Sequence, residues 1–105
     1  MRMRVVYQKG EDARWIGHLD LMRAMQRALR RSRLPIRYSG GFHPHVLVTF
    51  APPMGAGMLG AHEIMDVPLL EEVAPETFLA GLSAALPPAL AATACYIAAD
   101  DAPAP

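Results

Sequence analysis

The chain has 105 residues, of which 52% are hydrophobic and 19% are charged, and Cys95 is its single cysteine. This length fits one domain, and a lone cysteine excludes an internal disulfide as well as the cysteine-only sites that bind iron–sulfur clusters. The formal net charge of zero hides a strong asymmetry. Residues 1–50 carry ten basic and three acidic side chains, whereas residues 51–105 carry seven acidic side chains and no basic one. A basic surface of this density favours a polyanion or an acidic protein as partner.

Membrane and export signals are not evident. No apolar stretch approaches the roughly 18 residues that a membrane helix requires. The first residues lead into a strand-like pattern and not into an apolar run followed by a cleavage site, so we expect no signal peptide. With one unpaired cysteine, the sequence predicts a cytoplasmic protein that does not enter a membrane.

The first predicted element is a strand, because Met3, Val5 and Tyr7 alternate with polar residues before the turn at residues 10–12. Next, an amphipathic helix is predicted from His18 to Arg33, where Pro35 follows as a stop signal. Its apolar residues recur at three- and four-residue spacing and its arginines lie on the opposite side. We expect three side chains to be buried, namely Met22, Met25 and Leu29. Three others should be exposed, namely Arg23, Arg27 and Arg30.

The second half of the chain is predicted as an alternation of short elements. These are an extended connection over 35–44 with Gly40 and Gly41 as its hinge, a strand over 45–50, a loop over 51–60, a strand over 61–69, a helix over 75–86 and a strand over 91–98. A disordered tail is expected from residue 99 to residue 105. The order strand–helix–strand–strand–helix–strand is that of a ferredoxin-like α+β sandwich, in which two helices cover one face of an antiparallel sheet. We therefore predict one such domain over residues 1–98.

A polar pocket is predicted at one edge of this sheet. A hairpin centred on the 51–60 loop would place His45 opposite Asp66, and Phe50 opposite Ala61. The topology would then gather five polar side chains, namely His18, Asp20, His43, His45 and Asp66. Such a group could anchor the glycine loop, contact a substrate, bind Zn²⁺ or transfer protons. Since no cysteine accompanies the imidazoles and no strong nucleophile lies near, we predict neither a metal site nor a catalytic residue, and no cofactor.

Six arginines form the candidate binding surface. They are Arg23, Arg27, Arg30, Arg31, Arg33 and Arg37. One interpretation is a solvated face that only keeps a small domain in solution. The other is a surface that contacts phosphates, because three of these arginines recur one helical turn apart and guanidinium groups bind phosphate in a bidentate manner. Aromatic residues are scarce on the open face of the predicted sheet, so RNA recognition by stacking on the sheet is not expected.

Three segments together resemble a known bacterial family. They are residues 14–21 with His18-Leu19-Asp20, residues 34–45 with Gly41-Phe42-His43-Pro44-His45, and residues 50–55. Within residues 2–98 the chain is similar to the radical SAM-linked protein family, a domain of unknown function that is encoded beside a radical SAM enzyme or fused to it. The resemblance implies a radical SAM enzyme as partner. Because the cysteine triad of such enzymes is absent, the chain itself is not expected to be the radical enzyme.

The sequence thus leads to two functional hypotheses. The first is a non-catalytic accessory domain that docks on a radical SAM enzyme, presents an RNA substrate through its basic helix, or does both. The alternative is a stand-alone RNA-processing or metal-dependent enzyme that uses the His and Asp side chains.

Overall fold

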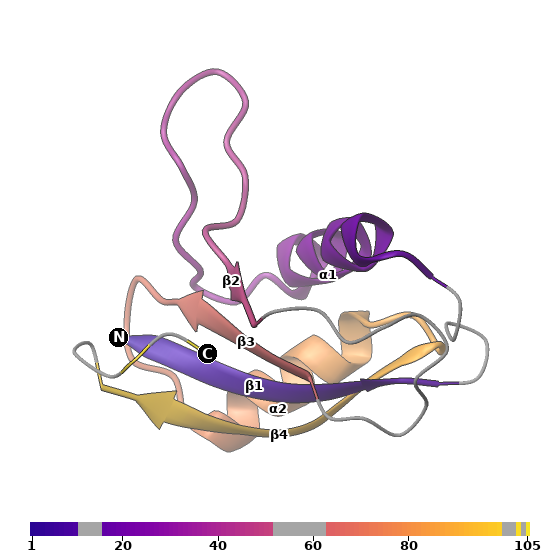
Figure 1. Ribbon diagram of the computed structural model, residues 1–105. Coiled ribbons are helices and arrows are strands. Elements are labelled where there is room, and N and C mark those ends of the chain that lie inside the picture. The colour runs from indigo at the N-terminus through magenta and orange to yellow at the C-terminus, as the bar shows by residue number, and fades with distance from the viewer. Residues whose placement is uncertain (11–15, 52–62, 100–102, 104) are drawn as a thin grey trace.

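Four antiparallel strands form one sheet in the order β2-β3-β1-β4, shown in Figure 1. The computed structural model describes residues 1–10, 16–51, 63–99, 103 and 105. The elements are β1 (Arg2–Lys9), α1 (His18–Ser32), β2 (Thr49–Phe50), β3 (Glu63–Pro68), α2 (Pro75–Ala85) and β4 (Leu90–Ala98). This order of elements and strands is the ferredoxin-like α+β arrangement, so the predicted fold class is confirmed.

The central strand β1 separates the two faces of the sheet. Met3, Val5 and Tyr7 are buried on one face, in a single core cluster with residues of both helices. The alternate residues of β1, which include Arg2 and Arg4, are half-buried on the open face. This alternation follows from the two-residue repeat of a strand that is covered on one side.

Helix α1 is divided into an apolar and a basic side, as its sequence predicts. Its buried residues are Leu21, Met25, Ala28 and Leu29, while Arg23, Arg27 and Arg30 are exposed. Met22 is only half-buried, which corrects the prediction that it lies in the core. Successive helical residues are about 100° apart, so Met22 lies beside the buried stripe and not within it.

The strand predicted over residues 45–50 is shorter and pairs differently. Only Thr49 and Phe50 belong to β2, where they lie opposite Asp66 and Met65. The predicted pairing of His45 with Asp66 is therefore wrong by four residues. Because the shift is even, each side chain still points to the predicted face, and Val46 is buried. Residues 52–62, which include most of the predicted hairpin loop, lie outside the described residues.

The C-terminal elements match their predicted positions closely. Helix α2 begins at Pro75, a residue favoured in the first turn, and buries Phe78 and Leu82. Strand β4 pairs with β1 along its whole length, with one register shift next to Val6. Within the described residues, neither helix is long and apolar enough to cross a membrane.

Arg33 ends α1 in a backbone conformation that is unfavourable for its side chain. Its φ of 59° lies in the left-handed region, where residues with a Cβ atom are strained and glycine is the usual helix-ending residue. The strain costs roughly 1–2 kcal/mol.

We therefore predict that Arg33→Gly raises the free energy of unfolding. The relief of strain should exceed the entropy that glycine adds to the unfolded chain and leave a gain of about 0.5–1 kcal/mol. Arg27→Gly is the matched control, because it removes the same charge from the exposed helix interior and should cost about 1 kcal/mol. Urea unfolding of both variants measures the difference. Equal destabilisation by both substitutions would contradict the left-handed helix end.

Candidate functional site

The arginines of α1 form a stripe on its exposed side. Because the apolar side of the helix is held in the core, Arg23, Arg27 and Arg30 project away from the sheet about one turn apart. Three further arginines follow them and are also exposed, namely Arg31, Arg33 and Arg37. These six residues are called the arginine surface below. The exposure predicted for Arg23, Arg27 and Arg30 is confirmed, and the role of all six residues in binding stays a prediction.

Most of the positive charge of the arginine surface is not balanced by a neighbouring carboxylate among the described residues. Arg23 lies 3.9 Å from Asp20, and both side chains are more than half exposed, so solvent screens this ion pair. Three other arginines bond to backbone carbonyl groups, which do not cancel a charge: Arg30 to Pro44, Arg31 to Ala85 and Arg37 to Leu69. The sequence contains no acidic residue between Asp20 and Glu63. Across the described residues, Arg23 is thus the one member of the surface with a carboxylate partner.

A protruding hairpin, formed by residues 36–47, stands beside the end of α1 and rises above the sheet in Figure 1. Tyr38 and Val46 form a bridge between its two arms. The Ser39 amide donates to the His45 carbonyl at 2.8 Å and the Leu47 amide to the Arg37 carbonyl at 3.1 Å. The Ser39 hydroxyl also accepts a bond from the His45 amide at 3.0 Å and lies 2.9 Å from the His45 ring Nδ1.

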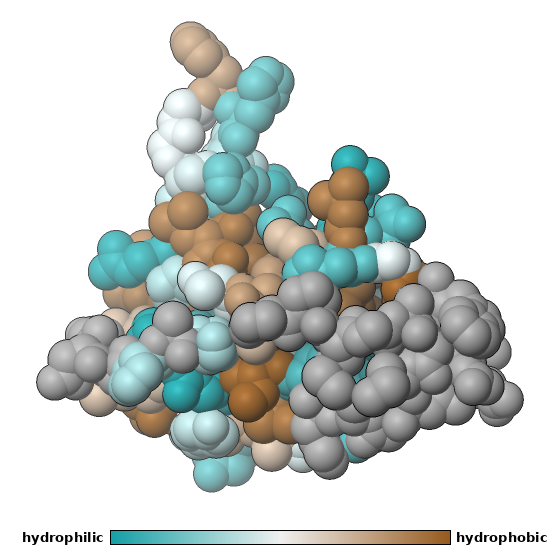
Figure 2. Space-filling model, in the orientation of Figure 1, coloured by the Kyte–Doolittle hydropathy of each residue, from teal (hydrophilic) through white to brown (hydrophobic). Residues whose placement is uncertain are grey.

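The tip of the hairpin carries an aromatic ring in full solvent contact. Gly41 has a φ of 98°, which only glycine adopts readily, and it lets the chain reverse direction there. Phe42 follows and is 100% exposed. Figure 2 shows a hydrophobic tip above a hydrophilic stem at this end of the molecule. The repeated glycines predicted a hinge, but the sequence did not show that Phe42 would lack any contact with the core.

Arg30 joins the arginine surface to the hairpin. Its Nη2 donates to the Pro44 carbonyl at 2.9 Å, and its guanidinium carbon lies 5.3 Å from the centre of the Tyr38 ring. The first contact holds one arm of the hairpin and the second holds the other. A cation over an aromatic face is stabilised by the ring quadrupole. The hairpin is therefore fixed against the last turn of the basic helix.

The five residues of the predicted polar pocket lie in three separate places. His18 begins α1 and packs edge-on against Phe50, with ring centres 6.0 Å apart. Arg30, which contacts the hairpin, is about 18 Å further along the helix at roughly 1.5 Å per residue. His43 and His45 are exposed on that hairpin. The prediction of one edge was wrong because β1 and β3 are antiparallel, so Arg2 at the start of β1 lies opposite Pro68 at the end of β3.

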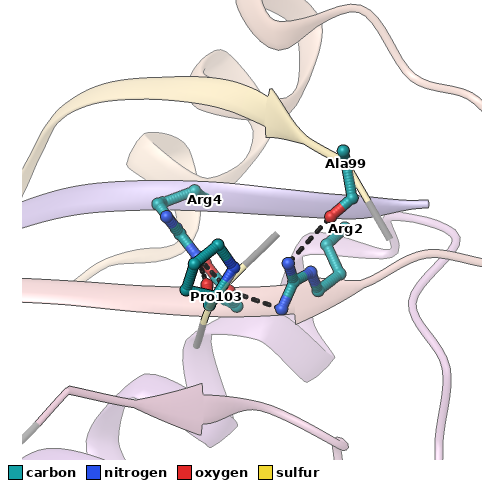
Figure 3. A network of polar contacts seen from close by, with 5 residues as sticks. Arg2, Arg4, Ala99 and Pro103 are labelled. Atoms are coloured by element: carbon teal, nitrogen blue, oxygen red, sulfur yellow. Dashed lines mark hydrogen bonds and ion pairs between the residues drawn. The ribbon is translucent and has the colours of Figure 1, made fainter. Parts of the chain in front are cut away.

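Asp66 belongs to a charged network on the open face of the sheet, shown in Figure 3. Its two carboxylate oxygens accept bonds from Arg4 Nε at 2.8 Å and Arg4 Nη2 at 2.9 Å, and Arg2 Nη1 lies 3.2 Å away. The Asp66 side chain is only 2% exposed, and a buried carboxylate is tolerated where a cation pairs with it, as the bidentate Arg4 does here. The hydrogen bonds from Arg4 raise the pKa of that guanidinium above its ordinary value.

The same two arginines hold part of the C-terminal segment. Arg2 donates to the Ala99 carbonyl at 2.8 Å and Arg4 to the Pro103 carbonyl at 2.6 Å. These contacts were not predicted, because a tail of Asp, Ala and Pro gives no pattern that specifies a partner. Residues 100–102 and 104 lie outside the described residues.

The remaining reactive side chains do not assemble into a catalytic group in the described part of the chain. No three residues of the His, Cys, Asp or Glu types lie close enough there to bind a metal ion. Cys95 donates its thiol to the Pro75 carbonyl, and burial raises the pKa of that thiol. His18 has a buried Nδ1 atom that makes no hydrogen bond. These groups lie on different elements, and no contact joins them.

We predict a negligible effect on stability at His45 and a large loss of stability at Asp66. His45 is exposed and its ring bonds to the Ser39 hydroxyl at the surface, so His45→Ala should change the free energy of unfolding by no more than about 0.5 kcal/mol. Asp66→Ala removes the carboxylate that pairs in a bidentate manner with Arg4 and should lower the melting temperature by at least about 5 °C. Thermal unfolding followed by circular dichroism measures both. A larger loss at His45 than at Asp66 would contradict the geometry of both sites.

Comparison with known proteins gives a family but no function. Neither a curated protein nor a solved structure matches the chain significantly. A family model described as an uncharacterized protein conserved in bacteria, DUF2344, matches residues 2–105. This match covers nearly the whole chain, including the arginine surface, the protruding hairpin and the Asp66 network. The chain therefore belongs to the DUF2344 family.

Proposed function

We propose that this protein is a non-catalytic accessory domain of a radical SAM enzyme system and that its arginine surface contacts an RNA substrate. The observation that carries the proposal is the stripe of exposed guanidinium groups on α1, whose partners are carbonyl groups and, for Arg23 alone, a solvent-screened carboxylate. A polyanion gains affinity at such a surface because each neutralised phosphate releases counterions. Guanidinium groups also match phosphate oxygens in pairs.

The opposite face of the domain is less suited to this task. Proteins that bind RNA on a sheet of this topology stack bases on aromatic residues of the two central strands. On the open face, β1 offers Arg2 and Arg4, and β3 offers Ile64 and Asp66. The charged groups among these already bond to one another. The helical side therefore supports nucleic-acid binding better than the sheet does.

The enzyme partner is proposed from the resemblance of three sequence segments to the radical SAM-linked family. A radical SAM enzyme binds its iron–sulfur cluster through a cysteine triad, whereas this chain has Cys95 alone. The radical chemistry would thus come from the partner, in the cytoplasm, and this domain would bring the substrate to it. No observation favours the alternative of a stand-alone metal-dependent enzyme, since the candidate donor residues lie on separate elements.

The proposal predicts that Arg23, Arg27 and Arg30 together determine the salt dependence of RNA binding. In a gel shift with total RNA at several salt concentrations, replacing the three by alanine should remove roughly three phosphate contacts. For single-stranded RNA the slope of log K against log salt should then decrease in magnitude by about 2.

The matched control replaces the same three residues by lysine, which keeps the charge. The lysine variant should retain most of the salt slope and lose affinity only to the extent that bidentate contacts matter. RNA binding that is unchanged in the alanine variant, or no binding by the wild type at low salt, would contradict the proposal.

A further inference from the structure

We propose that the protruding hairpin is a binding element for single-stranded RNA, in which Phe42 stacks on one unpaired base while neighbouring arginines hold the phosphates. This inference rests on the proposed function and deepens it, because it names the part of an RNA that the domain would recognise. The combination of a basic track with exposed aromatic rings is the usual means of binding single strands without base-specific hydrogen bonds.

The ring of Phe42 is available on both of its faces. It is 100% exposed, and an added Cβ atom at Gly40 or Gly41 would meet no other atom within 4 Å. The tip of the hairpin thus stands clear of the rest of the described structure. A base that stacks on Phe42 would remove apolar surface from water without displacing any contact within the protein.

The stem of the hairpin below this ring is held by several contacts. Two backbone hydrogen bonds and the Ser39 hydroxyl join its arms below the tip. Arg30 contacts both arms, through the Pro44 carbonyl and the Tyr38 ring. A ligand would therefore meet a largely formed site and lose less entropy in ordering it.

The charge around the hairpin fits a phosphate backbone. Arg37 is exposed on the first arm, and Arg30 and Arg33 lie at the end of α1 where that arm begins. No acidic residue occurs anywhere in residues 21–62. A strand that follows the arginine stripe along α1 would reach the hairpin at Arg30. There the next nucleotide could place its base on Phe42.

This geometry favours a single strand over a duplex. The bases of a duplex are stacked on each other and do not offer a free face to a side chain at a hairpin tip. A duplex would therefore use the arginine surface alone. A protein partner that receives Phe42 in an apolar pocket is the competing possibility, and the arginines on and against the hairpin stem favour the polyanion.

The test compares Phe42→Ala, Phe42→Trp and Phe42→Leu with the wild type. The probes are a fluorescently labelled 12-nucleotide oligoadenylate, a 12-base-pair RNA duplex and inorganic polyphosphate. The Phe42→Ala variant should bind oligoadenylate roughly tenfold more weakly than the wild type, because it lacks the ring on which one base stacks. Affinity for the duplex and for polyphosphate should stay within about twofold of the wild type, because these ligands would contact only the arginines. Phe42→Trp should bind oligoadenylate at least as tightly as the wild type.

The outcomes separate the inference from the proposed function. If the wild type binds oligoadenylate and Phe42→Ala binds it equally well, the stacking inference is wrong and the arginine surface remains. If Phe42→Leu equals the wild type, the ring acts only as an apolar anchor, which also overturns stacking. If Phe42→Ala keeps the wild-type affinity for all three probes, a protein contact is the better interpretation of the tip. If the wild type binds none of the three probes, the proposed function itself fails.

Discussion

The packing of α1 on the sheet is the interaction on which the rest of this structure depends. Met25, Ala28 and Leu29 have no measurable exposure, and each large apolar side chain stabilises the fold by about 1.5–3 kcal/mol through its burial. Rotating the helix by one residue, about 100°, would turn guanidinium groups toward the core, where an unpaired charge is very costly. The core therefore fixes the direction of the arginine stripe, and a basic surface is a consequence of folding itself.

The position of the hairpin depends on where α1 ends. Arg33 ends the helix in the left-handed conformation, and the chain then runs past Ile36, which is buried and bridged to Leu69. From that point the two arms leave the sheet beside Arg30, so the hairpin stands next to the basic helix. On the opposite face of the sheet the arginines are used differently, because the guanidinium groups of Arg2 and Arg4 form ion pairs with the buried Asp66. The molecule thus uses two sets of arginines for two purposes, internal neutralisation and external charge.

Periodicity in the sequence was sufficient to predict the fold and the direction of α1, because burial repeats every two residues in β1 and every three to four in α1. The register of β2 was not predictable in this way. The glycines and prolines of residues 51–60 indicate a loop but do not define which residues of the two flanking strands pair. A register shift of four residues leaves every side chain on the same face, so the alternation of Val46 and Phe50 is the same in both registers. The polar pocket failed for two reasons. The pairing of His45 with Asp66 was wrong by four residues, and the antiparallel course of β1 and β3 places the start of β1, not its end, beside the end of β3. Sequence identified the arginines of the surface, but the isolation of Phe42 required the arrangement of the whole hairpin.

If the proposed function is right, the helical side of the domain, and not its sheet, binds RNA. A titration of isotope-labelled protein with an oligoadenylate, followed by changes in backbone amide chemical shifts, tests this claim most directly because it locates the ligand without altering the protein. We expect the shifts to concentrate on the exposed side of α1 and on residues 36–47, with the amides of β4 almost unchanged. Shifts centred on β1 and β4, with the hairpin unaffected, would contradict it.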